Sequence, residues 1–178
     1  MSRPRVCADT ARHARRTLEV MPNVRRLNHA VLYVRDARRT SAFYREVLGF
    51  HVVQEAAGGR AVFLRASGSS NHHDIGLFSV GDVASARGVG LYHLAWQVDT
   101  IDELAELRTR LLEAKALAGE SDHGVSKSLY AHDPDGIEFE IMWMVPESDW
   151  GTYATDAVVA PLDINAEVSR WSGVATRV

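Results

Sequence analysis

Two stretches of the chain carry the same pattern of apolar and polar positions. The first is Leu27–Val34 (LNHAVLYV) and the second is Leu91–Val98 (LYHLAWQV). His29 and His93 hold the same position in the two stretches, at an offset of 64 residues (93 − 29 = 64). Both stretches are rich in β-branched, aromatic and aliphatic residues, which is typical of β-strands. A pattern that recurs at a fixed offset indicates two copies of one supersecondary unit.

Each predicted strand is followed by a sequence typical of an amphipathic helix. The first helix is expected from about Ala37 to Leu48, with Gly49 as its C-cap. The second helix is expected to follow Thr100, because Glu103 lies three residues later and completes a capping box. Its apolar residues recur at helical spacing, at Ile101, Leu104, Leu107 and Leu111.

Three strand-like runs follow each helix, separated by turns rich in Gly, Pro, Asp and Ser. The order is therefore βαβββ twice, which predicts an α+β fold made of two βαβββ modules joined by a linker at 81–89. The six runs are His51–Glu55, Ala61–Arg65, Asp74–Val80, a stretch near His123–Val125, Ser128–His132 and Ile137–Met144.

Composition limits the size and class of the protein. The chain has 178 residues and 19.7 kDa, and 46% of it is hydrophobic and 24% charged, which indicates one globular domain and excludes a disordered chain. A net charge of −3 argues against nucleic acid as a partner, and no apolar run reaches the roughly 18 residues of a membrane span. The single cysteine, Cys7, excludes an intrachain disulfide and a cysteine-based zinc site. We expect a cytoplasmic protein that binds neither nucleic acid nor membrane.

The chain divides into three predicted parts. A basic N-terminal arm precedes the repeated modules, and a C-terminal extension follows them, in which Asp163 is expected to cap a short helix at Ile164–Trp171. Aromatic residues of the extension predict either a cover over one end of a pocket or a tail packed outside the sheets: Trp150, Tyr153 and Trp171. The three parts are 1–23, 24–144 (modules 24–80 and 90–144) and 145–178.

Strand geometry predicts where the polar side chains of the modules lie. A strand alternates its side chains between two faces, so His29 and His93 are expected on the faces that point away from the helices. The last strand places Glu140 on that same side. Its other face, which is expected to pack on the helices, is formed by Phe139, Ile141 and Trp143. If the modules pair with pseudo-two-fold symmetry, the two histidines face one another.

Two interpretations of these polar residues remain open. A lone histidine in a strand is usually a hydrogen-bonded core residue. A symmetry-related pair weakens that interpretation, and Glu140 weakens it further because an unpaired carboxylate in so hydrophobic a strand is costly. Two histidines and one carboxylate form the facial triad that suits non-heme Fe(II). The residues alone therefore support a metal site and a structural histidine pair about equally.

Residues 24–144 resemble the vicinal oxygen chelate superfamily, which includes glyoxalase I, bleomycin-resistance proteins and extradiol dioxygenases. NHAVLYVRDARRTSAFYREVLGF and YHLAWQVDT are similar to its two module openings, and YAHDPDGIEFE is similar to its closing strand. The resemblance implies an open, eight-stranded, barrel-like sheet built from the two modules. It also implies that His29, His93 and Glu140 are the metal ligands.

Further residues resemble the extradiol branch of the superfamily, which has small single-domain members. His72-His73-Asp74-Ile75 is similar to its HD segment, which implies that His73 lies near bound oxygen and handles protons. DHGVSKSLY is similar to its HG…Y segment, which implies that His123 and Tyr130 lie near the substrate. The alternatives are His72 in place of His73, a surface-loop role for either histidine, and ordinary strand packing for Tyr130.

The resemblance implies an Fe(II)-dependent extradiol dioxygenase that uses O2 to cleave a catechol-type aromatic diol, acting as a homo-oligomer. Mn(II), Zn(II) and Ni(II) are alternative metals. One rival is a glyoxalase-like lyase or isomerase; the other is a non-enzymatic, bleomycin-resistance-like binding protein. Glyoxalase I takes a fourth ligand, a glutamate, from the last strand of its first module. The corresponding run Asp74–Val80 has no glutamate, and Asp74 stands at its start.

Overall fold

The computed structural model describes residues 26–82 and 91–176. The predicted arm 1–23, Cys7 and most of the predicted linker lie outside the described residues. The first module consists of β1 (Ala30–Val34), α1 (Ala37–Leu48), β2 (His51–Ala56), β3 (Ala61–Arg65) and β4 (Ile75–Ser79). The second consists of β5 (Leu94–Gln97), α2 (Ile101–Glu113), β6 (Leu117–Asp122), β7 (Ser126–His132) and β8 (Glu138–Met144), and α3 (Ile164–Trp171) follows it.

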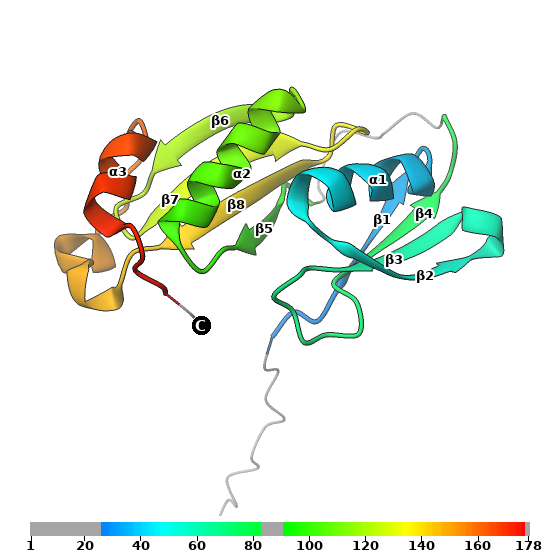
Figure 1. The fold of residues 1–178 in the computed structure, drawn as a ribbon, viewed down its shortest axis with the longest axis horizontal. Helices are drawn as coiled ribbons and strands as arrows, with labels where there is room; N and C mark the ends of the chain where they lie inside the picture. Colours follow the sequence, from blue (N-terminus) through cyan, green and yellow to red (C-terminus); the bar gives the residue numbers. More distant parts are fainter. Residues whose placement is uncertain (1–25, 83–90, 177–178) are drawn as a thin grey trace, which may run out of the picture.

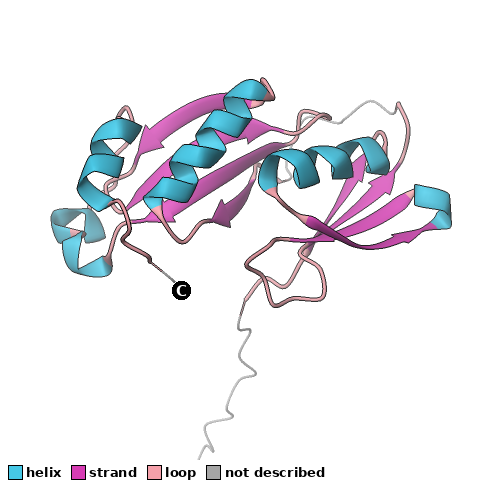
Figure 2. Ribbon diagram, in the orientation of Figure 1, coloured by secondary structure: helices cyan, strands magenta, loops and turns pink. Residues whose placement is uncertain are grey.

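Each module forms a four-stranded sheet of the same topology, in the order β1-β4-β3-β2 and β5-β8-β7-β6. In both sheets the first strand pairs in parallel with the last, and the other pairs are antiparallel. The α+β class and the two-module organisation are thus confirmed. The described strands stay in two sheets and do not close into a barrel, and α1 and α2 cover the same side of the molecule (Figures 1 and 2).

Local sequence determines where the helices begin and end. The Asp36 carboxylate accepts hydrogen bonds from the backbone N–H groups of Arg38 and Arg39 and begins α1. Gly49 ends α1 with a φ of 71°, a left-handed conformation that glycine adopts without steric penalty. At α2 the Thr100 hydroxyl accepts from Glu103 N, and the Glu103 carboxylate accepts from Thr100 N, which is the predicted capping box.

The prediction of a strand near His123–Val125 is wrong. The strand before β7 is β6, at Leu117–Asp122, and His123–Val125 forms the connection from β6 to β7. The sequence LAGESD contains no β-branched or aromatic residue, so its strand propensity is weak. It is held instead by its ladder to β7 and by Arg108 of α2, whose Nη2 donates to Glu120 Oε1 at 2.9 Å.

The two modules are packed side by side through residues from their helix-covered faces. The Tyr44 and Phe139 rings lie 6.0 Å apart between centroids, and the Phe50 and Trp96 rings 5.2 Å apart. These contacts join two buried clusters into a continuous core. The clusters include Val34, Leu64, Ile75 and Leu77 in the first module, and Leu104, Leu129, Ile141 and Trp143 in the second.

Candidate metal centre and catalytic residues

The second module brings two expected metal ligands together on its helix-free face. His93 Nε2 lies 3.1 Å from Glu140 Oε2. Glu140 sits in the middle of the sheet, between Ala95 of β5 and Tyr130 of β7. Both side chains are largely shielded from solvent, with 23% of His93 and 11% of Glu140 exposed. The opposite face of β8 is buried against the helices, as predicted.

The chemistry of this pair fits a divalent metal ion. Imidazole nitrogen and carboxylate oxygen are the donors that non-heme iron and related ions take. His93 Nδ1 is buried without a hydrogen bond and lies 3.5 Å from Glu138 Oε1. A carboxylate next to the second ring nitrogen is the usual way to orient a metal-binding histidine. No role was predicted for Glu138 from the sequence, although its position two residues from Glu140 puts it on the same face of β8.

The first module holds the other expected histidines. His29 is exposed, and its ring centroid lies 4.6 Å from that of His73. The His73 ring packs against Phe63, with 5.1 Å between ring centroids. His72 is exposed and contacts His73, with 5.4 Å between their ring centroids. His73, rather than His72, therefore neighbours His29. The pKa of His73 is lowered, first by burial and then by the adjacent His29 and His72.

One chain does not bring the three expected ligands to one point. His29 lies directly before β1 of the first sheet, whereas His93 lies directly before β5 of the second sheet and Glu140 lies within β8. The two histidines were predicted within strands, which begin one residue after each of them. Within residues 26–82 and 91–176, no three His, Cys, Asp or Glu side chains lie close enough together to hold a metal ion. The physical reason is the side-by-side packing of the modules, which gives each sheet its own helix-free face instead of closing the two faces over one another.

His123 and Tyr130 lie together beside the second-module ligands. His123 Nε2 is 2.9 Å from the Tyr130 hydroxyl, and the Tyr130 ring is 5.9 Å from that of His93. Burial raises the pKa of Tyr130, and the Glu140 carboxylate raises it further. Tyr130 therefore stays protonated at neutral pH. This face gathers His93, Glu140, Tyr130 and His123 into one polar group.

Asp74 is not free to act as a fourth ligand. Its Oδ2 accepts from Ala66 N at 2.8 Å, and its Oδ1 accepts from Ser69 Oγ at 2.8 Å and from Asn71 Nδ2 at 2.7 Å. The carboxylate is buried and stabilises the loop before β4. The feature that completes the glyoxalase I ligand set has no equivalent at this position.

Trp150 and Trp171 of the C-terminal extension pack against the second-module core, which supports a packed tail rather than a pocket cover. Trp171 lies 5.9 Å from Trp143, and Trp150 Nε1 donates to the Val145 carbonyl at 2.7 Å. Tyr153 lies over Gly124, next to His123. The extension thus reaches the candidate site from its edge.

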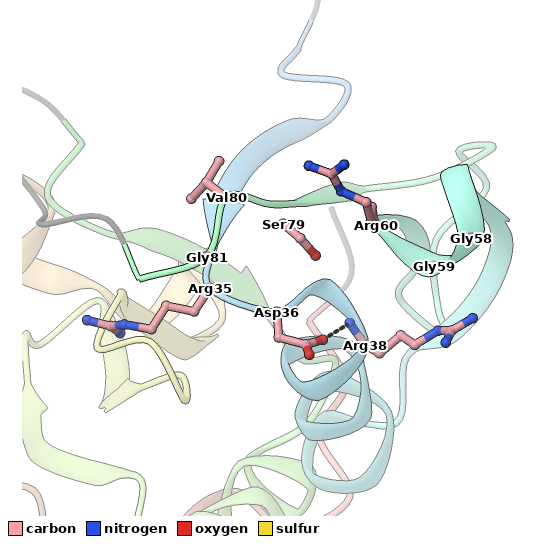
Figure 3. A pocket seen from close by; sticks show the side chains of 9 residues that line it. All are labelled: Arg35, Asp36, Arg38, Gly58, Gly59, Arg60, Ser79, Val80 and Gly81. Atoms are coloured by element: carbon pink, nitrogen blue, oxygen red, sulfur yellow. Dashed lines mark hydrogen bonds between the residues drawn. The ribbon is translucent and has the colours of Figure 1, made fainter.

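A surface cleft of about 450 Å³ lies elsewhere, at the start of α1 (Figure 3). Figure 3 shows the Arg35 and Arg38 side chains extending to opposite sides of Asp36. Arg35 pairs with Asp135 at 3.1 Å, and Arg38 pairs with Glu55 at 3.3 Å. Arg35 and Arg38 are each paired with a carboxylate, whereas Arg60, which also lines the cleft, forms no ion pair within the described residues.

Comparison with known proteins places this geometry in a family. Residues 26–141 match the Glyoxalase/Bleomycin resistance protein/Dioxygenase superfamily. The chain belongs to this superfamily. It is 34% identical over 125 residues to the Catechol-2,3-dioxygenase of Bacillus subtilis (strain 168), which covers 70% of this chain and 43% of that protein. It is 35% identical over 124 residues to Biphenyl-2,3-diol 1,2-dioxygenase 3 of Rhodococcus globerulus, which covers 65% and 62%. The match spans less than two thirds of either relative's length.

Two solved structures show the same fold. A glyoxalase/dioxygenase from Nostoc punctiforme has a TM-score of 0.59 at 23% identity, over 70% of this chain and 94% of that chain. The fosfomycin resistance protein FosX from Listeria monocytogenes, solved with Mn(II) and a sulfate ion, has a TM-score of 0.57 at 22% identity, over 74% and 99%. None of the helices in the described ranges is both long and apolar enough to span a bilayer.

Proposed function

We propose that this protein is an Fe(II)-dependent extradiol dioxygenase, which cleaves the ring of a catechol-type diol next to its hydroxyl groups and incorporates both atoms of O2. The observation that carries the proposal is the polar group on the second sheet, in which His93 and Glu140 converge beside Tyr130 and His123. The names of the relatives, a catechol dioxygenase and biphenyl-diol dioxygenases, support this substrate class.

Each polar residue has a role in the proposed reaction. Fe(II) held by His93, Glu140 and a third ligand would supply a Lewis acid for the diol and a reductant for O2. Tyr130, kept protonated by burial and by Glu140, is placed to hydrogen-bond an oxygen of the diol. His73 has a lowered pKa and is therefore neutral at neutral pH, so it can accept a proton and return it during the reaction.

We infer that His29 of a second copy provides the third ligand beside His93 and Glu140. This inference is supported by the lack of a third His, Cys, Asp or Glu close to that pair within the described part of one chain. The contacts of Tyr44 with Phe139 and of Phe50 with Trp96 hold the two modules of one chain side by side. Closing the two helix-free faces over one another within a chain would break this core.

The surfaces around His29 in the first module and around His93 and Glu140 in the second module support a homodimer. The strands β1 and β5 are both edge strands, and exposed edges with apolar side chains favour pairing with another chain. Val31 and Tyr33 of β1 are 53% and 76% exposed, and Tyr92 beside His93 is 76% exposed. A two-fold axis would place the first module of each copy on the second module of the other and form two complete sites.

The proposed reaction is tested by purifying the protein without air, loading Fe(II), and adding a panel of catechols while following oxygen uptake and the coloured ring-opened product. We expect oxygen uptake that requires both Fe(II) and a catechol. Turnover with another metal and without oxygen uptake would instead identify a lyase or isomerase. Failure to bind any divalent metal would identify a binding protein. The Asp74 carboxylate already accepts three hydrogen bonds and is not available as a fourth metal ligand, which argues against the glyoxalase reaction.

A further inference from the structure

The connection that carries His123 is held by the C-terminal extension. Asp122 and Ala160 exchange both of their backbone hydrogen bonds, with Asp122 N donating at 2.8 Å and Ala160 N donating at 2.9 Å. Gly124 lies so close beneath the Tyr153 ring that an added Cβ would clash with it. The two residues that flank His123 are therefore both fixed by the segment between Tyr153 and Ala160.

The His123 ring lies between two partners of different chemistry. Its Nδ1 is 3.1 Å from the backbone carbonyl of Val158, and its Nε2 is 2.9 Å from the Tyr130 hydroxyl. A carbonyl oxygen can only accept a hydrogen bond, so Nδ1 must carry the proton. In the neutral ring, Nε2 is then an acceptor, and the Tyr130 hydroxyl donates to it.

We propose that Val158, through its backbone carbonyl, is a positioning residue that holds His123 in the Nδ1–H tautomer and directs the Nε2 lone pair at Tyr130. The C-terminal extension thereby becomes part of the site. A histidine tautomer is set by the hydrogen bond that its other nitrogen makes, and here that bond comes from residues 153–160.

The catalytic consequence rests on the proposed dioxygenase function. With its hydrogen directed at His123, Tyr130 presents its oxygen as an acceptor to a hydroxyl of the diol. The diol O–H bond breaks as a new Tyr130 O–H bond forms, and the original Tyr130 proton moves to His123 Nε2. The diol is left as an anion, His123 as an imidazolium whose Nδ1–H is still bound to the Val158 carbonyl, and Tyr130 as a donor to the anion.

The tautomer is measured directly by two-bond ¹H–¹⁵N NMR on protein labelled at histidine nitrogen, with the His123 signals assigned from the His123→Gln variant. We expect the Nδ1–H pattern for His123 in the free protein. The Nε2–H pattern would overturn the proposal. This measurement needs neither metal nor turnover. The role of Val158 in positioning His123 is therefore tested even if the dioxygenase assay fails.

A backbone substitution tests the cause of the tautomer. Replacing Val159 by its α-hydroxy acid turns the Val158 carbonyl into an ester carbonyl, which is a weaker acceptor, and leaves every side chain unchanged. We expect the His123 signals to move to a mixture of tautomers. The matched control is the same replacement at Val158, which weakens the Ala157 carbonyl; among the described residues, that carbonyl has no backbone or side-chain donor. The proposal would be overturned if both esters changed the His123 signals equally, or if neither ester changed them.

A pair of glycine variants tests the link between the extension and turnover. Gly124→Ala forces Tyr153 away from the His123 connection, whereas Gly58→Ala, also at positive φ, meets open space. We expect Gly124→Ala to lose the Nδ1–H pattern and to lower kcat by about tenfold or more with its bound iron unchanged, and Gly58→Ala to retain both. If the Gly124→Ala protein folds and keeps both its His123 tautomer and its kcat, the proposal is contradicted. If this variant does not fold, the ester variants test the proposal in its place.

Discussion

At the scale of single residues, the hydrogen-bonding state of a buried carboxylate decides what it is free to do. Asp74 and Glu140 are both buried acids in or beside apolar strands. Asp74 accepts three hydrogen bonds from its own loop, so its burial is fully compensated. Glu140 lies against His93 and Tyr130, two groups that also belong to the candidate site. The partners of each acid in the fold therefore distinguish a structural carboxylate, Asp74, from a candidate ligand, Glu140.

The adjacent histidines of the first module offer a matched pair of substitutions. His73→Phe preserves a flat ring against Phe63 and removes the group proposed to handle protons. We expect it to keep its bound iron and to lose turnover by about 100-fold or more. His72→Phe, one residue away and exposed, should retain turnover. Oxygen-uptake kinetics at equal iron content measure both, and turnover retained by His73→Phe would remove His73 from the mechanism.

Asp133, in the turn before β8, predicts a pH dependence of stability. Burial raises the pKa of its carboxyl above 3.8, against the opposing effect of hydrogen bonds from the Ile137 and Asp135 N–H groups. The folded state therefore binds more protons than the unfolded state just above pH 3.8, and the contribution of Asp133 to stability falls as pH rises through that window.

Asp133→Asn keeps an acceptor for both N–H groups and removes the charge. We therefore expect the variant to gain stability relative to the wild type on going from about pH 4 to about pH 7. Urea unfolding across this range measures the difference in unfolding free energy. A difference that does not change with pH would contradict the assignment of the raised pKa to Asp133.

At the scale of elements, the sequence predicts best where one local interaction determines a boundary. The Thr100–Glu103 capping box, Gly49 and the Asp163 cap of α3 each fixed a helix end that the structure confirms. The edge strand β6 was missed because its stability comes from pairing with β7 and from Arg108, which are tertiary contacts. The contact between His123 and the C-terminal extension was also not predicted, because it is a tertiary contact. Its acceptor is the backbone carbonyl of Val158, which no sequence pattern indicates.

The capping box predicts a measurable contribution to stability. Thr100→Ala removes the hydroxyl that accepts from Glu103 N, and we expect it to lower the free energy of unfolding by about 1 kcal/mol. Thr109→Ala is the control, because Thr109 is an exposed residue within the same helix and alanine favours helix there. Urea titration of both variants measures the two changes in the free energy of unfolding. Equal changes would show that the cap adds nothing beyond helix propensity.

At the scale of the whole molecule, the sequence predicts the parts of the site but not their assembly. The 64-residue repeat predicted two modules and their helix-free faces, and both are confirmed. It did not predict that Phe50 would pack on Trp96 and hold the modules side by side. That contact depends on the folded shapes of both modules. It leaves His29 on one sheet and His93 with Glu140 on the other, so the proposed site needs two copies of the chain.

Mixing two inactive chains tests whether the metal site is shared between copies. His29→Ala and Glu140→Ala are co-expressed with different affinity tags, and dimers containing one of each are isolated. In a composite site, one of the two sites of the mixed dimer receives intact ligands from both chains, so about half of the wild-type oxygen uptake per dimer should return. Each variant by itself should bind no iron and take up no oxygen with a catechol. Mixed dimers as inactive as the two parent variants would contradict a site shared between copies.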